Sequence, residues 1–386
     1  MAESARRTTT SVLQVVFDNS LLLLFGAVTA LVWANLHLGS YERFAHAFHF
    51  AVNDVGMVFF FALAAKEVYE ATLPGGPLAS PRQAMVPVFA AVGGMVVPAL
   101  VYVGAVLAID RPELVRGWAI PCATDIAFSY LVARLVFPSG HPAIPFLLLL
   151  AIADDAMGLV VLAVFYPSGP LDPLQLAAWL APAIAAAWVL RRTGTRSFWA
   201  YVAGPGALSW MALHTGGIHP ALAMVPIVPF MPHGKSDLEV FGRGRLSGFT
   251  TLHDFEHWWR IPVQFVLFAF GLANAGVPLT SVGSASWIVA GSLIVGKPVG
   301  ILALTALCVA VGFRRAPGLD YRSIAVLGVM AGIGFTVALF FTTAAFPPGP
   351  VLDEAKMGAL LSFFAAPLAL GLGRLFVSRH RGGASA

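Results

Sequence analysis

The sequence predicts an all-α, polytopic membrane protein with twelve transmembrane helices. Of its 386 residues, 58% are hydrophobic and only 11% are charged, and the mean hydropathy is +0.82. A soluble domain carries about 25% charged residues. Apolar segments also recur along the chain at the length of about 20 residues that a bilayer core of roughly 30 Å requires. In addition, Lys and Arg are concentrated in every second connection between these segments.

Short connections rich in Pro and Gly separate the twelve apolar segments. The segments centre on residues 13–35, 51–73, 85–108, 118–136, 144–166, 174–191, 198–213, 218–231, 259–276, 284–308, 322–346 and 356–377. The longest polar connection, residues 232–257, divides the chain loosely into two halves. We expect a single integral membrane domain over residues 1–386, with no soluble module.

The twelve-segment topology gathers most basic residues on one side of the membrane. Sixteen Lys and Arg residues fall on that side: Arg6, Arg7, Arg82, Arg191, Arg192, Arg196, Lys235, Arg243, Arg245, Arg260, Arg314, Arg315, Arg322, Arg374, Arg379 and Arg381. Four fall on the other side: Arg43, Arg111, Arg116 and Lys356. Because connections rich in Lys and Arg remain in the cytoplasm, we expect both termini there. The basic pI near 9.3 therefore indicates topology and not nucleic-acid binding.

Two segments are interrupted near their middles. The fourth reads "GWAIPCATDIAFSYLVARL" and contains Thr124 and Asp125, and the eleventh reads "GVMAGIGFTVALFF" and contains Gly332 and Gly334. Matched interruptions predict unwound helices that cross near the midplane, where half-helix ends and freed carbonyls bind ions. The alternative is that Gly and Pro are simply common in membrane helices. Asp125 beside one interruption favours the functional interpretation.

Three aspartates and one lysine lie inside apolar segments, where an ionisable side chain costs about 3 kcal/mol. Asp154 and Asp155 lie in the middle of "IPFLLLLAIADDAMGLVVLAVFY", and Lys297 lies in "SLIVGKPVGILAL". Adjacent helical residues point about 100° apart, so the two aspartates face different partners, and Lys297 is the natural counter-ion for one. Thr124 and Asp125 offer hard oxygen ligands suited to alkali cations. The alternative is a permanently paired ion bridge that holds helices together.

Further charged residues near segment ends are candidates for a function: Lys66, Glu67, Glu70, His219, Glu256 and His257. His219 begins its segment, where a hydrogen-bonded histidine at the membrane interface is the alternative. The first three close the second segment, where long side chains can instead snorkel to the interface. A Glu–His pair at a membrane entrance can sense pH, although a solvated turn has the same pattern. Asn53 and Asp54 are expected to cap the start of the second segment.

Several of these stretches, in their order, resemble the NhaA-type sodium/proton antiporter family over nearly the whole chain. They are "PLASPRQA", "FAAVGGMVVPALVY", "GWAIPCATDIAF", "FLLLLAIADD", "LANAGV", "IVGKPVG" and "GIGFT". The resemblance implies an inverted repeat of segments 3–5 and 10–12, with segments 4 and 11 broken and crossing. It also implies alternating access and electrogenic exchange of Na⁺ or Li⁺ for protons, in a bacterial cytoplasmic (inner) membrane, with no cofactor.

By the same resemblance, Asp155 is the main carboxylate for cation and proton, and Asp154 is the partner of Lys297. Thr124 and Asp125 stand at the helix crossing, where Asp125 offsets the half-helix dipoles. The implied ligands of Na⁺ or Li⁺ are Asp155, Asp154 and Thr124.

The chain departs from the family pattern at three places. The second segment ends in "AKEVYE", with Lys66 where an acid is expected, and "WWR" follows Glu256 and His257 in place of a second histidine. His219 does match a family histidine linked to pH response. The resemblance thus implies that the six charged residues near segment ends are candidates for a response to pH, and the form of that pH dependence stays open. The connection 36–50 is too short for the β-hairpin by which some members dimerise, so a homodimer would form by helix packing.

Two other functions fit parts of the same pattern. A sodium-coupled symporter of the same fold would require a roomy polar substrate cavity, which the sequence does not indicate. An intramembrane aspartyl protease is conceivable because Asp125 and Asp155 lie on different segments, but it would require a "GxGD" stretch and the chain offers only "GIGF". We therefore expect a transporter and not an enzyme.

Overall fold

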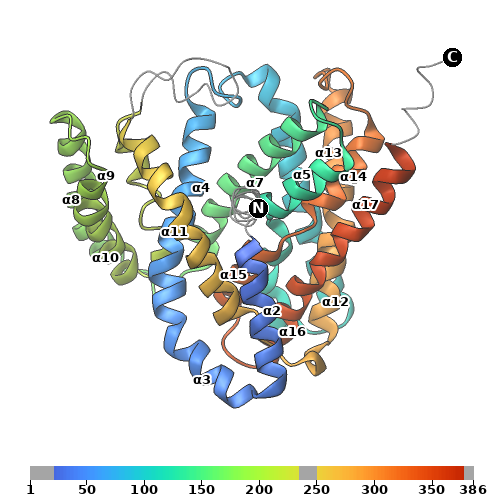
Figure 1. The fold of residues 1–386 in the computed structure, drawn as a ribbon, viewed down its shortest axis with the longest axis horizontal. Helices are drawn as coiled ribbons and strands as arrows, with labels where there is room; N and C mark the ends of the chain where they lie inside the picture. The colour runs from blue at the N-terminus through green and yellow to red at the C-terminus, as the bar shows by residue number, and fades with distance from the viewer. Residues whose placement is uncertain (1–20, 234–249, 378–386) are drawn as a thin grey trace, which may run out of the picture.

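Helices make up all the regular structure that the protein shows over the described residues (Figure 1). The computed structural model describes residues 21–233 and 250–377, with the side chains of 81–83 left aside, and these ranges contain no β-strand. The predicted all-α class is therefore confirmed for this part of the chain.

The elements range from single 3-10 turns to the 28 residues of α5, and η marks a 3-10 or π-helical stretch. In chain order they are α2 (Leu21–Leu36), α3 (Leu38–His49), η1 (Phe50–Gly56), α4 (Met57–Thr72), α5 (Pro81–Ala108), η2 (Pro112–Gly117), η3 (Ile120–Cys122), α6 (Ile126–Val136), α7 (Ala143–Phe165), α8 (Pro173–Arg192), α9 (Phe198–Tyr201), η4 (Val202–Gly206), α10 (Ala207–Gly216), η5 (Pro220–Leu222), η6 (Val228–Phe230), α11 (Thr251–Asn274), η8 (Leu279–Ser281), α12 (Ser284–Gly291), η9 (Ser292–Gly296), α13 (Lys297–Ala310), α14 (Tyr321–Ala331), α15 (Phe335–Ala345), α16 (Pro350–Leu361), η10 (Ser362–Phe364) and α17 (Ala365–Phe376).

Six helical stretches in the described ranges are long and apolar enough to cross a bilayer, and two bent helix pairs raise the number to eight. The six are Leu38–Thr72, Ala84–Ala108, Ala143–Phe165, Pro173–Arg192, Ser284–Ala310 and Pro350–Phe376. The chain thus has the multiple apolar helices of a multi-pass membrane protein. The eighth expected segment, residues 218–231, holds only the short 3-10 helices η5 and η6.

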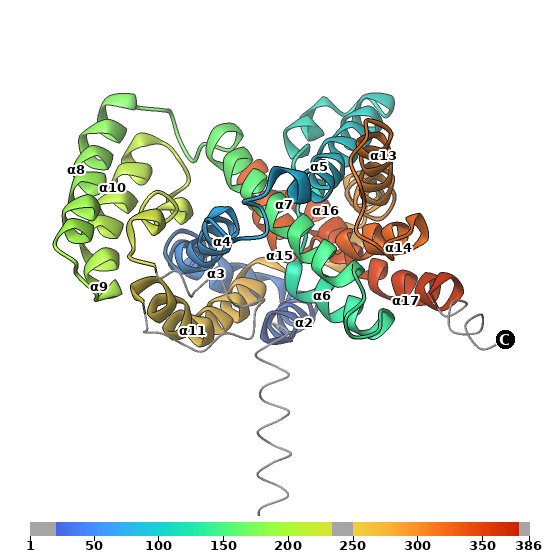
Figure 2. The same cartoon turned by 90° about the horizontal axis from the view of Figure 1, so that it is seen from above.

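The helices form two groups that are seen side by side in Figure 2. One group contains α5, α6 and α7 together with α12 to α17, and the other contains α2 to α4 and α8 to α11. The second group is itself divided, because α8 packs mainly on α10 at the outer edge while α2 packs on α11. The contact of α4 with α7 joins the two groups.

The expected helix cap at Asn53 and Asp54 is wrong. The helix has already begun at Leu38, and both residues lie inside it in the π-helical turn η1. Asn53 is buried and exchanges hydrogen bonds with Asn274 of α11, at 3.1 Å from its Nδ2 to Oδ1 and 2.9 Å in return. The two buried side-chain amides therefore meet part of each other's need for hydrogen bonds, between this helical stretch and α11.

Helices α5 and α13 approach each other most closely at two glycines. A Cβ atom on Gly93 would lie 2.1 Å from the carbonyl oxygen of Gly300, and one on Gly300 would lie 2.0 Å from that of Gly93. Small residues allow the backbones of membrane helices to approach in this way. Lys297 is the first residue of α13, so this contact also fixes where the lysine enters the core.

Both interruptions predicted from the sequence are present. The stretch Pro112–Cys122 meets α6 at a bend of 53°, and α14 meets α15 at a bend of 49°. The backbone N–H of Asp125 donates to the carbonyl oxygen of Ile333 at 2.7 Å, so the two breaks are in direct contact. Unwound backbone at this depth is tolerated because each break supplies partners for the other.

We predict that Gly300→Ala destabilises the protein, because the added methyl group meets backbone that cannot move aside. Overpacking of this kind costs roughly 1–3 kcal/mol, which should lower the unfolding temperature of the purified protein in detergent. Gly104→Ala, on α5, is the matched control because nothing lies within 4 Å of its Cβ position. An unfolding temperature for Gly300→Ala equal to that of the control would contradict the close contact.

Candidate ion-binding site at the helix breaks

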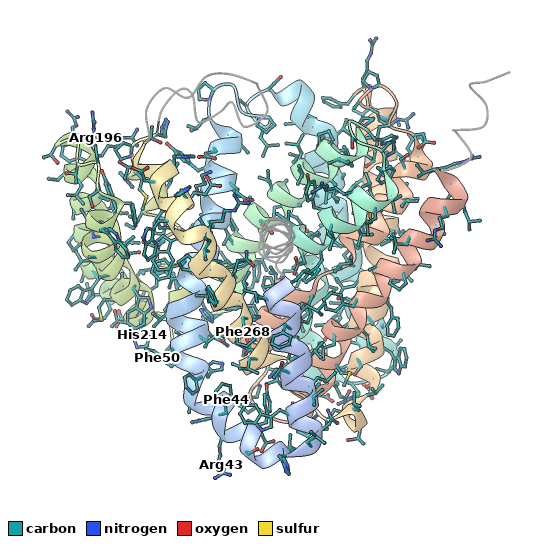
Figure 3. All side chains as sticks on the ribbon, in the orientation of Figure 1. Arg43, Phe44, Phe50, Arg196, His214 and Phe268 are labelled. Carbon is teal, nitrogen blue, oxygen red and sulfur yellow. The ribbon has the colours of Figure 1, made fainter. Side chains whose placement is uncertain are left out.

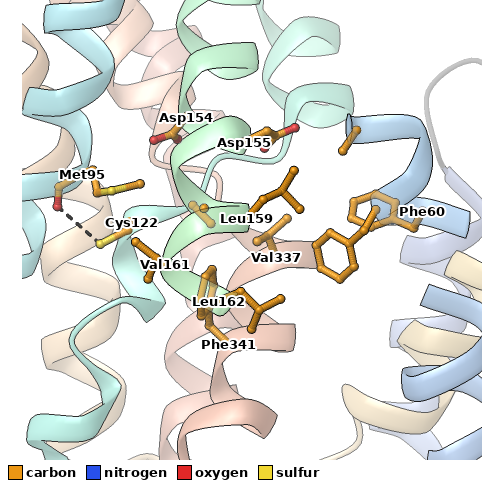
Figure 4. A pocket seen from close by; sticks show the side chains of 14 residues that line it. Phe60, Met95, Cys122, Asp154, Asp155, Leu159, Val161, Leu162, Val337 and Phe341 are labelled. Carbon is orange, nitrogen blue, oxygen red and sulfur yellow. Dashed lines mark hydrogen bonds between the residues drawn. The ribbon is translucent and has the colours of Figure 1, made fainter. Parts of the chain in front are cut away.

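The two adjacent aspartates of α7 point to different sides of the helix (Figure 4). Asp154 is buried and faces the side of Met95 and Cys122, whereas Asp155 is half-buried and faces α4. The angle between successive helical residues produces this divergence. Each carboxylate therefore has its own surroundings.

Asp154 forms an ion pair with Lys297 inside the protein. The Nζ atom of Lys297 lies 2.8 Å from Oδ2 of Asp154, and its side chain is fully buried. The same Oδ2 accepts a hydrogen bond from the hydroxyl of Thr124 at 2.7 Å, and Nζ also donates to the carbonyl oxygen of Cys122 at 2.6 Å. Cys122 ends the single 3-10 turn η3, so its carbonyl oxygen is free of a helical partner and can accept from the ammonium.

One oxygen of Asp154 and the whole carboxylate of Asp155 remain without such partners. Oδ1 of Asp154 is buried and has no hydrogen bond within the described residues. The ion pairs found in the same part of the chain do not include Asp155. A buried carboxylate oxygen without a partner is unfavourable, so a proton or a cation bound there would stabilise both groups.

A small cavity of about 20 Å³ lies beside the two aspartates (Figure 4). Its lining is otherwise mostly apolar and includes Phe60, Phe61 and Phe341. A space of this size holds about one water molecule. In this conformation it has space for one small ligand.

Asp125 stands at the N-termini of two half-helices. Its carboxylate accepts from the backbone N–H of Phe128 in α6 at 3.4 Å and from that of Thr336 in α15 at 3.2 Å. The hydroxyl of Thr336 donates to the same carboxylate. A carboxylate in this place satisfies free N–H groups and offsets the positive ends of two helix dipoles.

Hydroxyl groups occupy the opposite helix end, where α14 stops. The hydroxyl of Ser129 donates to the carbonyl oxygen of Met330 at 2.8 Å, and that of Thr124 lies 3.2 Å from the carbonyl oxygen of Ala331. Polar groups of α6 and of the turn before it thus meet carbonyls at the end of α14, where the carbonyl of Met330 also accepts from the backbone N–H of Ile333 at 3.0 Å.

Two glycines allow the second break to approach its neighbours. A Cβ atom on Gly332 would lie 2.6 Å from the carbonyl oxygen of Leu293, and one on Gly334 would lie 3.0 Å from that of Ala123. Both glycines therefore leave space that a side chain would fill.

Sequence reasoning missed three groups at the breaks: the hydroxyls of Thr336 and Ser129 and the carbonyl of Cys122. Thr336 belongs to the quoted "GIGFT" stretch, in which only the glycines were singled out. A hydroxyl within a few residues of an interruption is the signal that would have identified Thr336 and Ser129.

The candidates for pH response do not form one cluster. Lys66 lies between two acids, with Nζ 2.6 Å from Oε2 of Glu70 and 2.5 Å from Oε2 of Glu256. Lys66 is therefore paired inside the protein and does not snorkel. Glu67 and His257 are exposed next to this group.

His219 lies elsewhere, near the start of α4. Its Nδ1 is 4.0 Å from Oδ1 of Asp54 and accepts from the backbone N–H of Ala221 at 3.3 Å, and its ring packs on Phe340. Asp54 and Lys66 are twelve residues apart in one helical stretch, which separates the two groups by about 18 Å.

Comparison with known proteins identifies relatives along almost the entire chain. The sequence pattern of the family described as "Na+/H+ antiporter 1" matches residues 11–373. The Na(+)/H(+) antiporter NhaA of Geobacter metallireducens is 46% identical over 370 residues, which cover 94% of this chain and 97% of that protein. The NhaA protein of Geobacter sulfurreducens is 47% identical over 364 residues, with 92% and 95% coverage.

A solved structure shares the fold. The sodium proton antiporter MjNhaP1 from Methanocaldococcus jannaschii, determined at pH 8, matches with a TM-score of 0.55 over 93% of this chain and 90% of its own, at 14% identity. Because the family pattern and the relatives cover nearly all of the sequence, the chain belongs to the Na+/H+ antiporter 1 family.

Proposed function

We propose that the protein is a secondary active antiporter that exchanges cytoplasmic Na⁺ or Li⁺ for external protons across a bacterial cytoplasmic membrane. The observation that carries the proposal is the unpartnered Oδ1 of Asp154 beside Asp155, next to two broken helices. The small cavity favours an ion over the organic substrate of a symporter. The two Geobacter relatives described above are named Na(+)/H(+) antiporters, which points the same way.

The proposed topology has twelve spans and both termini in the cytoplasm, with the two halves of the core as inverted repeats. In its support, the order straight helix, broken helix, straight helix occurs twice. The first set is α5, the break before α6, and α7. The second is α12–α13, the break between α14 and α15, and α16–α17.

In the proposed cycle, a cation and protons compete for the same carboxylates. With the site open to the cytoplasm, Na⁺ binds deprotonated Asp155 together with Oδ1 of Asp154 and the Thr124 oxygen, and displaces protons. One group of helices then moves against the other and exposes the site to the outside, where protons expel the cation. The Asp154–Lys297 pair supplies a second titratable group, so the exchange moves net charge. The cycle needs no cofactor beyond the transported ions.

We further propose that pH acts through the charged groups at the two ends of α4. At one end are Lys66, Glu67, Glu70, Glu256 and His257, and at the other is His219. Two observations support this proposal. Lys66 pairs with Glu70 of α4 and Glu256 of α11, and α4 packs against α7, which carries the aspartates.

A homodimer formed by helix packing is also proposed. In the most apolar 18-residue part of helix α8, only 11% is buried inside the protein. This is the smallest buried share among the six spanning stretches. Its outer face is therefore available to a second copy of the chain or to lipid.

The central test follows proton movement with a pH-sensitive dye in everted vesicles from cells that lack their own antiporters. Addition of Na⁺ or Li⁺ should dissipate an imposed proton gradient, because cation entry expels protons from the shared site. A gradient that survives Na⁺, Li⁺ and K⁺ at every pH around neutrality would refute the antiport proposal.

Asp155→Asn should abolish Na⁺-dependent proton release, since the amide can neither ionise nor compete for a proton. Asp172→Asn is the matched control, because Asp172 only caps α8 at the surface and Asn caps a helix equally well. Exchange by the Asp155 variant at the rate of the control would place the cation site elsewhere.

Lys297→Ala should destabilise the fold, because it leaves the Asp154 carboxylate buried without its counter-charge, at a cost of about 3–5 kcal/mol. The double variant Asp154→Asn/Lys297→Ala should recover part of the unfolding temperature. In proteoliposomes, Lys297→Ala should also reduce the membrane potential that a Na⁺ gradient generates. A single variant with the stability and charge movement of the parent protein would argue against the ion pair.

A further inference from the structure

A second and much larger cavity lies at the ends of three helices, away from the aspartates. It has a volume of about 1060 Å³ and lies where the last turns of α6 and α17 meet the first turn of α14. These three helices pack on one another and lie together in Figure 2. Arg134, in the last turn of α6, is nine residues from Asp125 at its start, or about 14 Å along the helix. The cavity is therefore separate from the ion site.

Three guanidinium groups line this cavity, one from each helix or its connection: Arg134, Arg315 and Arg374. Asp320 is the one carboxylate among the described residues of the lining, and it accepts from the backbone N–H of Ser323 at 2.8 Å as the cap of α14. The lining thus carries more positive than negative charge.

Arg134 and Arg315 are held in place by contacts that do not use all of their N–H groups. Arg315 donates from Nη1 to the carbonyl oxygen of Leu319 at 3.0 Å, and its guanidinium lies 4.1 Å from the ring centre of Tyr321. Arg134 lies 5.7 Å from the ring centre of Tyr130. A guanidinium has five N–H groups, so each of these two can still bind the oxygens of an anion.

His141 adds a polar group to the lining. Its Nδ1 accepts from the backbone N–H of Ala143 at 3.2 Å, so in the neutral ring the proton is on Nε2. Burial lowers the pKa of His141 below its ordinary value, although Asp320 acts in the opposite direction. The histidine therefore contributes a neutral hydrogen-bond donor near neutral pH, and the positive charge comes from the arginines.

The same cavity has apolar walls that a soluble anion would not need. Leu135, Leu370, Phe376 and Val377 line it beside the arginines, and the side chains of Leu135 and Phe376 are 68% and 39% exposed. Exposed apolar groups next to basic ones at the end of a helix bundle match the boundary between acyl chains and head groups.

We propose that this cavity binds the phosphate head group of an anionic phospholipid, with acyl chains along Leu135 and Phe376. Arginines recognise phosphate through charge-assisted hydrogen bonds, and basic pockets between membrane helices bind anionic head groups. In this site the lipid contacts α6 and α14, each of which is one half of a broken helix. It would therefore connect the two broken helices at the ends that lie away from the breaks. This inference does not depend on the transport reaction.

The test compares the full-length protein with Arg134→Gln/Arg315→Gln, purified in detergent and mixed with defined lipids. The probes are phosphatidylglycerol, phosphatidylcholine with the same acyl chains, and inorganic phosphate. The control Arg43→Gln/Arg196→Gln removes the same charge from other elements (Figure 3). Bound lipid is counted by native mass spectrometry, and stabilisation is read from the unfolding temperature.

The parent protein and the control should retain phosphatidylglycerol in preference to phosphatidylcholine, and should unfold at a higher temperature with it. The double variant should bind phosphatidylglycerol about 25-fold more weakly, since each basic residue near an anionic head group contributes about fivefold. If the variant is less stable without lipid, its unfolding temperature with phosphatidylglycerol is compared with its own unfolding temperature with phosphatidylcholine. This difference is then compared between the variant and the parent protein.

Three results would overturn the proposal. They are equal phosphatidylglycerol binding by the variant and the parent protein, equal retention of both lipids by the parent protein, and the same stabilisation by inorganic phosphate alone. The last result would identify a site for a soluble anion.

Discussion

The buried ion pair of Lys297 and Asp154 is the interaction on which the arrangement of the core depends. Charge inside a membrane is costly unless it is compensated, and the two breaks compensate one another. Asp125 faces the positive N-terminal ends of α6 and α15, and Lys297 faces the carbonyl at the end of η3. Once these charges are matched, Asp155 is the carboxylate that stays available at the cavity. The proposed ion site is thus formed by the carboxylate oxygens that the fold leaves without a partner, those of Asp155 and Oδ1 of Asp154.

This division requires two adjacent carboxylates on one straight helix. If both faced the same side, both would compete for Lys297, and neither would be free to exchange a cation for a proton. The angle of about 100° between neighbours ties one side chain to α13 and turns the other towards α4. The close contact of Gly93 and Gly300 holds α13 near enough for the lysine to reach, so a packing feature of the backbone determines the electrostatics of the site.

Features that depend on local pattern were predictable from the sequence. Among contacts between distant segments, the pairing of an aspartate with Lys297 was predictable because few charges lie inside the apolar segments, whereas other distant contacts were not. The breaks were predictable because Pro, Gly and Asp interrupt apolar runs, and the divergence of Asp154 and Asp155 is a result of helix geometry alone. The contact of Lys66 with Glu256 joins residues 190 positions apart, so no local pattern contains it. Asn53 was assigned to a cap because polar residues normally start an apolar helix. Its amide instead pairs with Asn274, a partner that only the folded chain reveals.

Helix α4 connects the remaining charged groups to the site. Its outer ends contact Glu256 and the region of His219, while Phe60 and Phe61 between them form one wall of the cavity beside Asp155. Phe61 packs on Phe340, and Phe340 packs on His219, so one aromatic chain extends from the cavity wall to the histidine. In the proposed cycle, a change of charge at either end of α4 therefore acts on the space available to the cation. Because an interior packed at crystal-like density transmits small displacements, and the cavity holds only about one water molecule, a shift of this wall would change the space beside Asp155.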